Sequence, residues 1–205
     1  MAHHGARVAI LASGSGTNAE RLMQAAADVE NVEVVLVVCN KRVAGVLDRA
    51  KKLGVPTWAI DSAALASGAV ESRLKELEVD FVALAGFLMK VPDALVVAFS
   101  GRMLNLHPSL LPAFGGKGMY GRHVHRAVAA ALAAGTIEST GITLHWVDSE
   151  YDSGPAFFQA EVRLEPGDDL ETITCKIQQL EAEHYAIQTL RAIRESLSLS
   201  DPGPG

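Results

Sequence analysis

RVAILASGSGTN, residues 7–18, is a short apolar run that leads into a turn of glycine and serine. A helix-length amphipathic segment follows at Ala19–Asp28, so the pattern predicts a strand over Arg7–Ser13, a loop and then a helix. The next apolar run, Val32–Cys39, is rich in valine, and continuous branched runs are typical of strands that are covered on both faces. These residues predict a unit in which a helix joins two parallel strands.

The same alternation continues through the first half of the chain. Further helices are expected at Val43–Leu53 and Ala69–Leu77, and further strands at Pro56–Ile60 and Asp80–Gly86. Repeated units of this kind form parallel α/β sheets with right-handed crossovers, which bind ligands beyond the carboxyl ends of their strands. We therefore expect functional residues just after the strands.

The second half has a different order of elements. They are a strand at Met103–His107, a helix at Val124–Ala134, β segments at Gly141–Val147 and Pro155–Leu164, and a long helix at Leu170–Glu195. The polar loop 148–154 between the β segments predicts a hairpin or adjacent strands added to the sheet. An acidic turn at 167–169 suits the start of the long helix, and residues 198–205 are expected to form a frayed tail.

Composition excludes several classes of protein. The chain has 205 residues, of which 49% are apolar, and its formal net charge is -6, so it does not attract polyanions in general and any bound phosphate is held locally. Cys39 and Cys175 are too far apart to indicate a disulfide framework or a zinc site. No signal peptide and no membrane-spanning run is recognisable. We expect a soluble cytoplasmic protein that binds neither nucleic acid nor membranes, with its oligomeric state left open.

The glycine and serine turn predicts a phosphate site. Backbone N–H groups, a helix dipole and hydroxyls between a strand and a helix can together hold a phosphate. Gly14-x-Gly16-x-x-Ala19 also fits a loose dinucleotide fingerprint, but Cys39-Asn40-Lys41 stand where that fingerprint expects an acidic residue. A phosphomonoester is therefore favoured over a dinucleotide, and a tight turn that needs glycine only for its geometry remains an alternative.

Asn105 and His107 are candidate catalytic residues. They lie two positions apart at the end of an expected strand, so their side chains share one face of the sheet. An amide beside an imidazolium is suited to stabilising the oxyanion that forms when an acyl carbon is attacked, and histidine can also transfer a proton near neutral pH. Pro108 restricts His107 to an extended backbone. A structural role for the histidine is the alternative.

The loop between the last two β segments contains three acids, Asp148, Glu150 and Asp152. A carboxylate near His107 would favour the charged form of the ring and orient it. Most acids in loops are simply solvated, and the residues alone do not distinguish among the three.

Five motifs, in this order, resemble the glycinamide ribonucleotide formyltransferases over nearly the whole chain. They are SGSGTN, CNKRVAG, LAGFLMKVP, NLHPSLLP, and DSEYDSGP followed by FFQAEV. The resemblance implies a Rossmann-like, mostly parallel sheet flanked by helices, with a C-terminal β extension and a long closing helix. It also implies 10-formyltetrahydrofolate as the cosubstrate, the amine of glycinamide ribonucleotide as the acceptor, and no metal. We expect a single domain over 1–205, with a nucleotide-phosphate-binding half at 7–100 and a catalytic and folate-binding half at 101–197.

The resemblance also assigns the site residues. The catalytic asparagine, histidine and aspartate of the family fall on Asn105, His107 and Asp152. Its substrate-binding residues fall on Ser15, Gly16, Thr17, Asn18 and Glu181, and its folate-contacting residues on Leu88, Met89, Lys90, Val91, Asn105 and Asp148. Glu183-His184 also resembles the glutamate and histidine pair of the family, so Glu183 is an alternative to Glu181.

Two features depart from many members of the family. Met89 stands where many have arginine, so Lys90 is expected to supply the charged contact to folate or the contact is absent. Ala113–Gly121 is a longer, glycine-rich loop, from which Lys117 is expected to reach the substrate phosphate as a flexible point charge. His145 matches a position near the site, with a packed core histidine as the equal alternative.

Three other functions compete with this assignment. A formyltetrahydrofolate deformylase is expected to have an additional N-terminal domain, and a transfer-RNA formyltransferase an additional C-terminal domain. A non-catalytic protein that binds a phosphate through the glycine loop would leave Asn105, His107 and Asp152 without a role.

Overall fold

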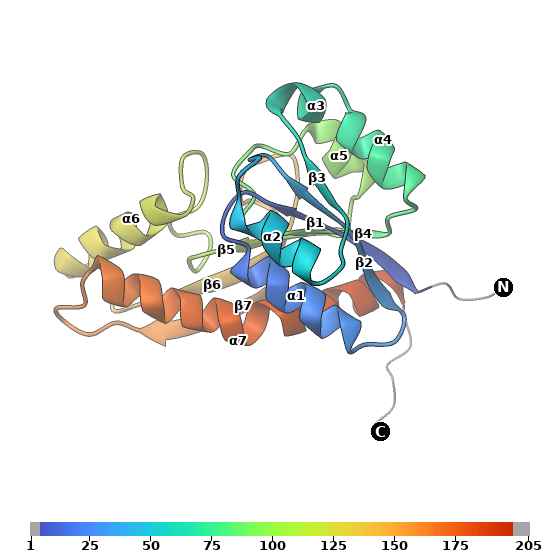
Figure 1. The fold of residues 1–205 in the computed structure, drawn as a ribbon. Coiled ribbons are helices and arrows are strands. Elements are labelled where there is room, and N and C mark those ends of the chain that lie inside the picture. The colour runs from blue at the N-terminus through green and yellow to red at the C-terminus, as the bar shows by residue number, and fades with distance from the viewer. Residues whose placement is uncertain (1–4, 199–205) are drawn as a thin grey trace.

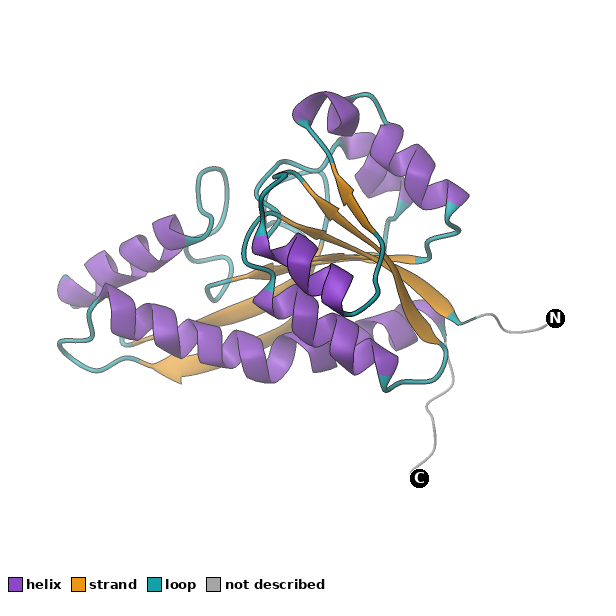
Figure 2. Ribbon diagram, viewed as in Figure 1, coloured by secondary structure: helices purple, strands orange, loops and turns teal. Residues whose placement is uncertain are grey.

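One seven-stranded sheet runs through the chain in the order β3-β2-β1-β4-β5-β6-β7 (Figures 1 and 2). The computed structural model describes residues 5–198. The strands are β1 (Ala6–Ala12), β2 (Val32–Cys39), β3 (Thr57–Ala59), β4 (Phe81–Leu84), β5 (Met103–His107), β6 (Ser139–Trp146) and β7 (Ala156–Arg163). β1 to β5 are parallel, and β6 and β7 are antiparallel to their neighbours, which confirms the mostly parallel sheet with a C-terminal β extension.

Helices cover both faces of this sheet. They are α1 (Thr17–Ala27), α2 (Gly45–Lys52), α3 (Ser62–Ala66), α4 (Ala69–Glu76), α5 (Asp93–Ala98), α6 (Arg122–Ala133) and α7 (Leu170–Leu197). α1, α2, α6 and α7 contribute to one apolar cluster and α3 to α5 to another, and Figure 1 shows α3 to α5 grouped on the side of the sheet away from α1 and α7.

The central strand β1 shows why its sequence is apolar throughout. Val8 and Ile10 belong to the cluster under α1 and α7, whereas Ala9 and Leu11 belong to the cluster under α3 to α5. All four side chains have no exposed area. A strand that packs helices on both faces cannot alternate apolar and polar residues, which explains the continuous run.

The strand order places a ligand-binding crevice at one predictable point. From β1 the chain goes outward to β2 and β3, and then returns to β4 on the other side of β1. Loops that leave β1 and β4 therefore diverge at the carboxyl edge of the sheet, which is where open α/β sheets bind ligands. The residues after β1, β4 and β5 all lie at this edge.

The helices differ from the sequence prediction in detail. α3 and α5 were not expected, because helices of five and six residues are too short to show a periodic apolar pattern. The long closing helix is confirmed, and the Asp169 carboxylate caps it by accepting a hydrogen bond from the Thr172 N–H at 2.8 Å. Ile187 of this helix is 64% exposed, since the buried stripe follows Ala186, Leu190 and Ile193. Residues 199–205 of the expected tail lie outside the described part of the chain.

Candidate active site

A cavity of about 490 Å³ opens at the carboxyl edge of β1, β4 and β5. The loop after β1, the segment after β4 and the end of β5 contribute to its wall, together with the glycine-rich loop before α6 and the loop 148–154. Its volume lies within the range of roughly 300–1,000 Å³ that is usual for small-molecule sites. Residues that are far apart in the sequence therefore line one cavity.

Asn105 and His145 form the first contact of this site. β5 and β6 are antiparallel, and their register sets Asn105 directly opposite His145. Nδ2 of Asn105 lies 3.0 Å from Nε2 of His145, and Nδ1 of His145 lies 3.1 Å from its neighbouring carbonyl at Trp146. Because a carbonyl only accepts, Nδ1 carries the proton and Nε2 accepts from the Asn105 amide. His145 is thus a buried residue that orients Asn105.

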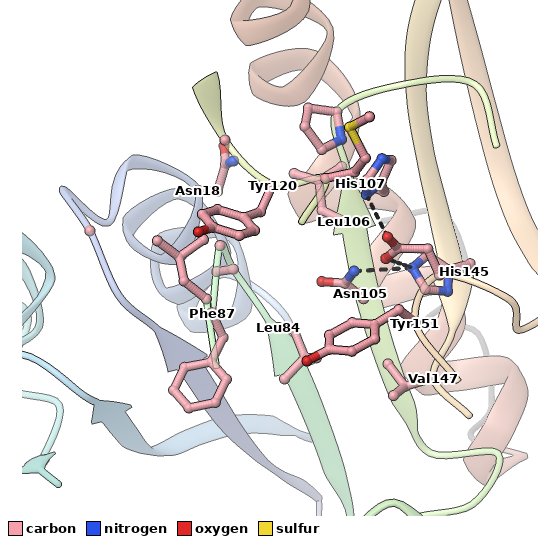
Figure 3. Close-up of a pocket in the computed structure, with 18 of the residues that line it drawn as sticks. Asn18, Leu84, Phe87, Asn105, Leu106, His107, Tyr120, His145, Val147 and Tyr151 are labelled. Atoms are coloured by element: carbon pink, nitrogen blue, oxygen red, sulfur yellow. Dashed lines mark hydrogen bonds and ion pairs between the residues drawn. The ribbon is translucent and has the colours of Figure 1, made fainter. Parts of the chain in front are cut away.

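Asp152 is placed between two histidines. Its Oδ2 lies 3.4 Å from Nδ1 of His107, and its Oδ1 lies 3.6 Å from Nε2 of His145. The backbone at Asp152 has a φ of 54°, in the left-handed region that few residues other than glycine adopt. Figure 3 shows Asn105, His107 and His145 converging on one side of the pocket. Of the three loop acids, Asp152 is the one in contact with His107.

The surroundings keep Asp152 ionised. Burial acts to raise the pKa of its carboxyl. The hydrogen bond from His107, the charge of His107 and the hydrogen bond from the Gly116 N–H act in the opposite direction and outweigh burial, so the pKa lies well below its ordinary value. The site therefore holds a carboxylate anion against an imidazole at neutral pH.

The glycine-rich loop 113–121 contacts both His107 and Asp152 through its main chain. Nε2 of His107 lies 2.9 Å from the Phe114 carbonyl, and the Gly116 N–H donates to Oδ2 of Asp152 at 3.0 Å. Because the Phe114 carbonyl only accepts, Nε2 of His107 carries a proton. A charged His107 can then donate from Nε2 to Phe114 and from Nδ1 to Asp152. The sequence did not indicate these contacts, since main-chain atoms make them on the loop side.

The glycine loop, which comprises residues 13–18 after β1, forms another part of the cavity. Gly16 is the N-cap of α1 with a φ of 81°, and no side chain caps this helix. A Cβ at Gly16 would lie 2.5 Å from Cβ of Val46, so only glycine fits. Asn18 donates from Nδ2 to Oε2 of Glu181 at 2.9 Å. The predicted residues Ser15, Gly16, Thr17, Asn18 and Glu181 all line the cavity.

Glu181 and Glu183 have different surroundings. Glu181 faces the cavity from α7, and burial raises the pKa of its carboxyl despite the Asn18 hydrogen bond and the nearby charge of Arg21. Glu183 is exposed and accepts a hydrogen bond from Gln179 at 2.9 Å. It does not line the cavity. Of these two glutamates, only Glu181 is in a position to contact a ligand bound there.

The segment after β4 supplies a further stretch of wall. Leu88, Met89, Lys90 and Val91, which the resemblance assigns to folate contacts, line the cavity, and the Leu88 N–H donates to Oγ of Ser13 at 2.8 Å. Nζ of Lys90 lies 3.4 Å from Oδ1 of Asp93 and 5.9 Å from the ring centroid of Tyr151. Met89 is uncharged and packs against the core, so the cation of this segment is Lys90.

Two predicted residues lie at the margin of the site. Asp148 lines the cavity from an exposed loop position, where its Oδ1 accepts from Oγ of Ser153 at 2.8 Å. Lys117 is exposed and is not among the cavity residues, although its neighbours Gly116 and Gly118 are. Within residues 5–198, no cluster of histidine, cysteine, aspartate or glutamate is arranged to hold a metal ion.

Comparisons with known proteins match this chain to one family. Residues 6–189 match the family model described as formyl transferase. The chain is 34% identical to phosphoribosylglycinamide formyltransferase of Bacillus subtilis (strain 168) over 203 residues, which cover 96% of this chain and 97% of that protein. It is 38% identical to the chloroplastic phosphoribosylglycinamide formyltransferase of Arabidopsis thaliana, with 92% of this chain covered but only 65% of that longer protein.

A solved structure leads to the same family. The crystal structure of phosphoribosylglycinamide formyltransferase from Anaplasma phagocytophilum matches with a TM-score of 0.83 and 30% identity. The match covers 93% of this chain and 88% of the other. Sequence and fold thus lead to the same result, and this chain belongs to the formyl transferase family, among relatives that are named phosphoribosylglycinamide formyltransferases.

Proposed function

We propose that this protein transfers the formyl group of 10-formyltetrahydrofolate to the primary amine of glycinamide ribonucleotide, a step of de novo purine biosynthesis. The observation that carries the proposal is the contact of Asp152 with His107 beside Asn105, in a cavity that reaches from the glycine loop to the segment 88–91. This arrangement provides a place for a phosphate, a place for a folate and a reacting centre. The full-length match to the B. subtilis enzyme supports the same substrates.

The residues present fit a folate as cosubstrate. Apolar side chains of Leu84, Phe87, Leu88 and Val147 line the cavity, and Tyr151 adds an aromatic ring (Figure 3). Lys90 supplies a positive charge near this part of the cavity. An apolar, partly aromatic wall with few polar groups is suited to a flat heterocycle.

The chemistry is a direct transfer between two bound substrates. The lone pair of the acceptor amine attacks the formyl carbon, a new C–N bond forms, and the carbonyl electron pair moves onto oxygen. Asn105 and the charge of His107 stabilise this oxyanion, and Asp152 stabilises the imidazolium. When the oxyanion collapses, the bond from the formyl carbon to the folate nitrogen breaks. Asp152, directly or through a water, takes the proton from the attacking nitrogen and delivers it to the leaving nitrogen.

One assay separates this proposal from its rivals. Purified protein is mixed with 10-formyltetrahydrofolate, with and without glycinamide ribonucleotide, and the loss of formylated folate is followed. We expect loss only when the acceptor is present. Loss without acceptor would identify a deformylase, and no loss in either tube would identify a binding protein.

We also propose that the chain acts as one formyltransferase domain in the cytoplasm. Pairing of β4 with β5 joins the phosphate-binding half and the catalytic half in one sheet, which supports a single domain. Cys39 and Cys175 are both free thiols, as is usual in a reducing compartment. No helix in the described part of the chain is long and apolar enough to cross a membrane.

A further inference from the structure

Arg21 lies beside the glycine loop, and the resemblance to the family assigns it no role. It lies in the second turn of α1, three residues after Asn18 and four after Thr17, so all three share one face of the helix. Arg21 lines the cavity together with Ser15, Thr17 and Asn18. Its side chain therefore borders the same space as the uncapped start of α1.

The charges around the cavity favour a cation at this place. Asp148, Glu150, Asp152 and Glu181 all line the cavity, and the whole chain has a formal net charge of -6. A phosphate dianion that enters beside Glu181 meets a like charge whenever this carboxyl is ionised, and like charges at close range are unfavourable. A positive charge beside Glu181 offsets this repulsion.

Arg21 is the lysine or arginine that is free to provide this charge. Among the described residues that line the cavity, the two side chains of these types are Arg21 and Lys90, and Lys90 is engaged by Asp93 and by the ring of Tyr151. No carboxylate of a described residue lies within ion-pair distance of the Arg21 guanidinium, whose hydrogen bond runs from Nη1 to Oδ1 of Asn18 at 3.5 Å.

Asn18 connects the two charged groups. Its Nδ2 donates to Glu181, and its Oδ1 accepts from Arg21, so a single amide orients both side chains. A guanidinium presents a planar set of N–H donors that matches phosphate oxygens in pairs. Lys117, the cation expected from the sequence, is exposed and outside the cavity lining.

We propose that Arg21 is a substrate-binding residue that holds the phosphate group of the ribonucleotide substrate, together with the N–H groups at the start of α1. The inference rests on the proposed function for the identity of the substrate, but it concerns only the phosphate. It makes Arg21 a determinant of preference for phosphorylated over unphosphorylated ribosides.

The test compares phosphorylated and unphosphorylated ligands. We expect Arg21→Ala to lower kcat/KM for glycinamide ribonucleotide by about 10- to 100-fold through KM, as expected for loss of charge-assisted hydrogen bonds. The value for glycinamide riboside, which lacks the phosphate, should change less than about twofold, and Arg21→Lys should retain part of the preference. Arg73→Ala on α4, an exposed arginine far along the sequence, is the matched control and should match the wild type.

Equal losses for both substrates would show that Arg21 only supports the structure, and an unchanged KM for the ribonucleotide would show that the phosphate is held without it. Either result overturns the inference. Ribose 5-phosphate binding by calorimetry provides a readout that needs no formyl transfer, and Arg21→Ala should weaken it at least tenfold. If the wild type binds ribose 5-phosphate through Arg21 but does not formylate the ribonucleotide, the proposed function fails while the role of Arg21 stands.

Discussion

Replacement of Asp152 by asparagine removes one negative charge and almost no volume. The asparagine oxygen can still accept from the Gly116 N–H, and its NH2 group lies beside the ring of His145. The variant is therefore expected to fold, with a melting temperature below that of the wild type because the ionised carboxylate contributes stability at neutral pH. What it loses is the charge opposite His107.

The size of the effect follows from the distance between these groups. Two unit charges 3.4 Å apart interact by about 5 kcal/mol at an effective dielectric constant of about 20, and desolvation offsets part of this energy. A loss of about 3 to 5 kcal/mol in transition-state stabilisation corresponds to roughly 10²- to 10⁴-fold in rate. Asp152→Asn should therefore lower kcat by roughly 10²- to 10⁴-fold, the range usual for loss of an acid–base group.

Steady-state assays with both substrates measure kcat, and calorimetry with glycinamide ribonucleotide measures binding, which should stay within about threefold of the wild-type affinity because the glycine loop is untouched. Glu150→Gln is the control, an exposed acid of the same loop without contact to His107. A correctly folded Asp152→Asn protein with near-normal kcat would remove this carboxylate from the mechanism. Equal losses in both variants would point instead to the loop as a whole.

Three further changes test other parts of the structure. Gly154→Ala should destabilise the protein by at least about 2 kcal/mol in urea unfolding, because a Cβ there overlaps the Trp146 carbonyl oxygen; unchanged stability would contradict the packing. Burial raises the pKa of Glu181, so the contribution of this carboxyl to the free energy of unfolding falls as the pH rises from about 4.3 through the folded pKa. Glu181→Gln has no carboxyl and therefore lacks this pH dependence. The melting temperature of the variant relative to wild type should rise between pH 4 and pH 8, and a constant difference would refute this. Tyr185→Phe removes the buried hydroxyl that donates to the Leu84 carbonyl at 3.1 Å and should cost about 1 kcal/mol, and no loss in the same unfolding experiment would show that this hydrogen bond contributes nothing.

The sheet was predictable because its strands are buried on both faces. Runs such as Val32–Cys39 are apolar at almost every position, and helices of ordinary length separate them, so both the parallel sheet and its carboxyl edge follow from the sequence. Short elements carry no such signal. α5 has six residues, and its apolar residues at Leu95 and Val96 fit a buried loop equally well.

The side chains of the site could be predicted from the sequence, whereas the contacts made by main-chain atoms could not. Asn105 and His107 could be paired from their spacing along β5, and Asp152 could be chosen among the loop acids only by resemblance to a family. The contacts from Phe114 and Gly116 depend on how a glycine-rich loop folds back, and glycine restricts the backbone too little for sequence to specify that path.

The glycine-rich loop 113–121 holds His107 and Asp152 through a carbonyl and an amide, so its effect on these two side chains depends on its path and not on the identity of its side chains. A substitution that keeps the backbone course of this loop leaves both contacts in place. Any displacement of the segment 114–116, in contrast, releases His107 and Asp152 in the same movement. The loop and the two side chains are therefore coupled, because one short backbone segment carries both contacts.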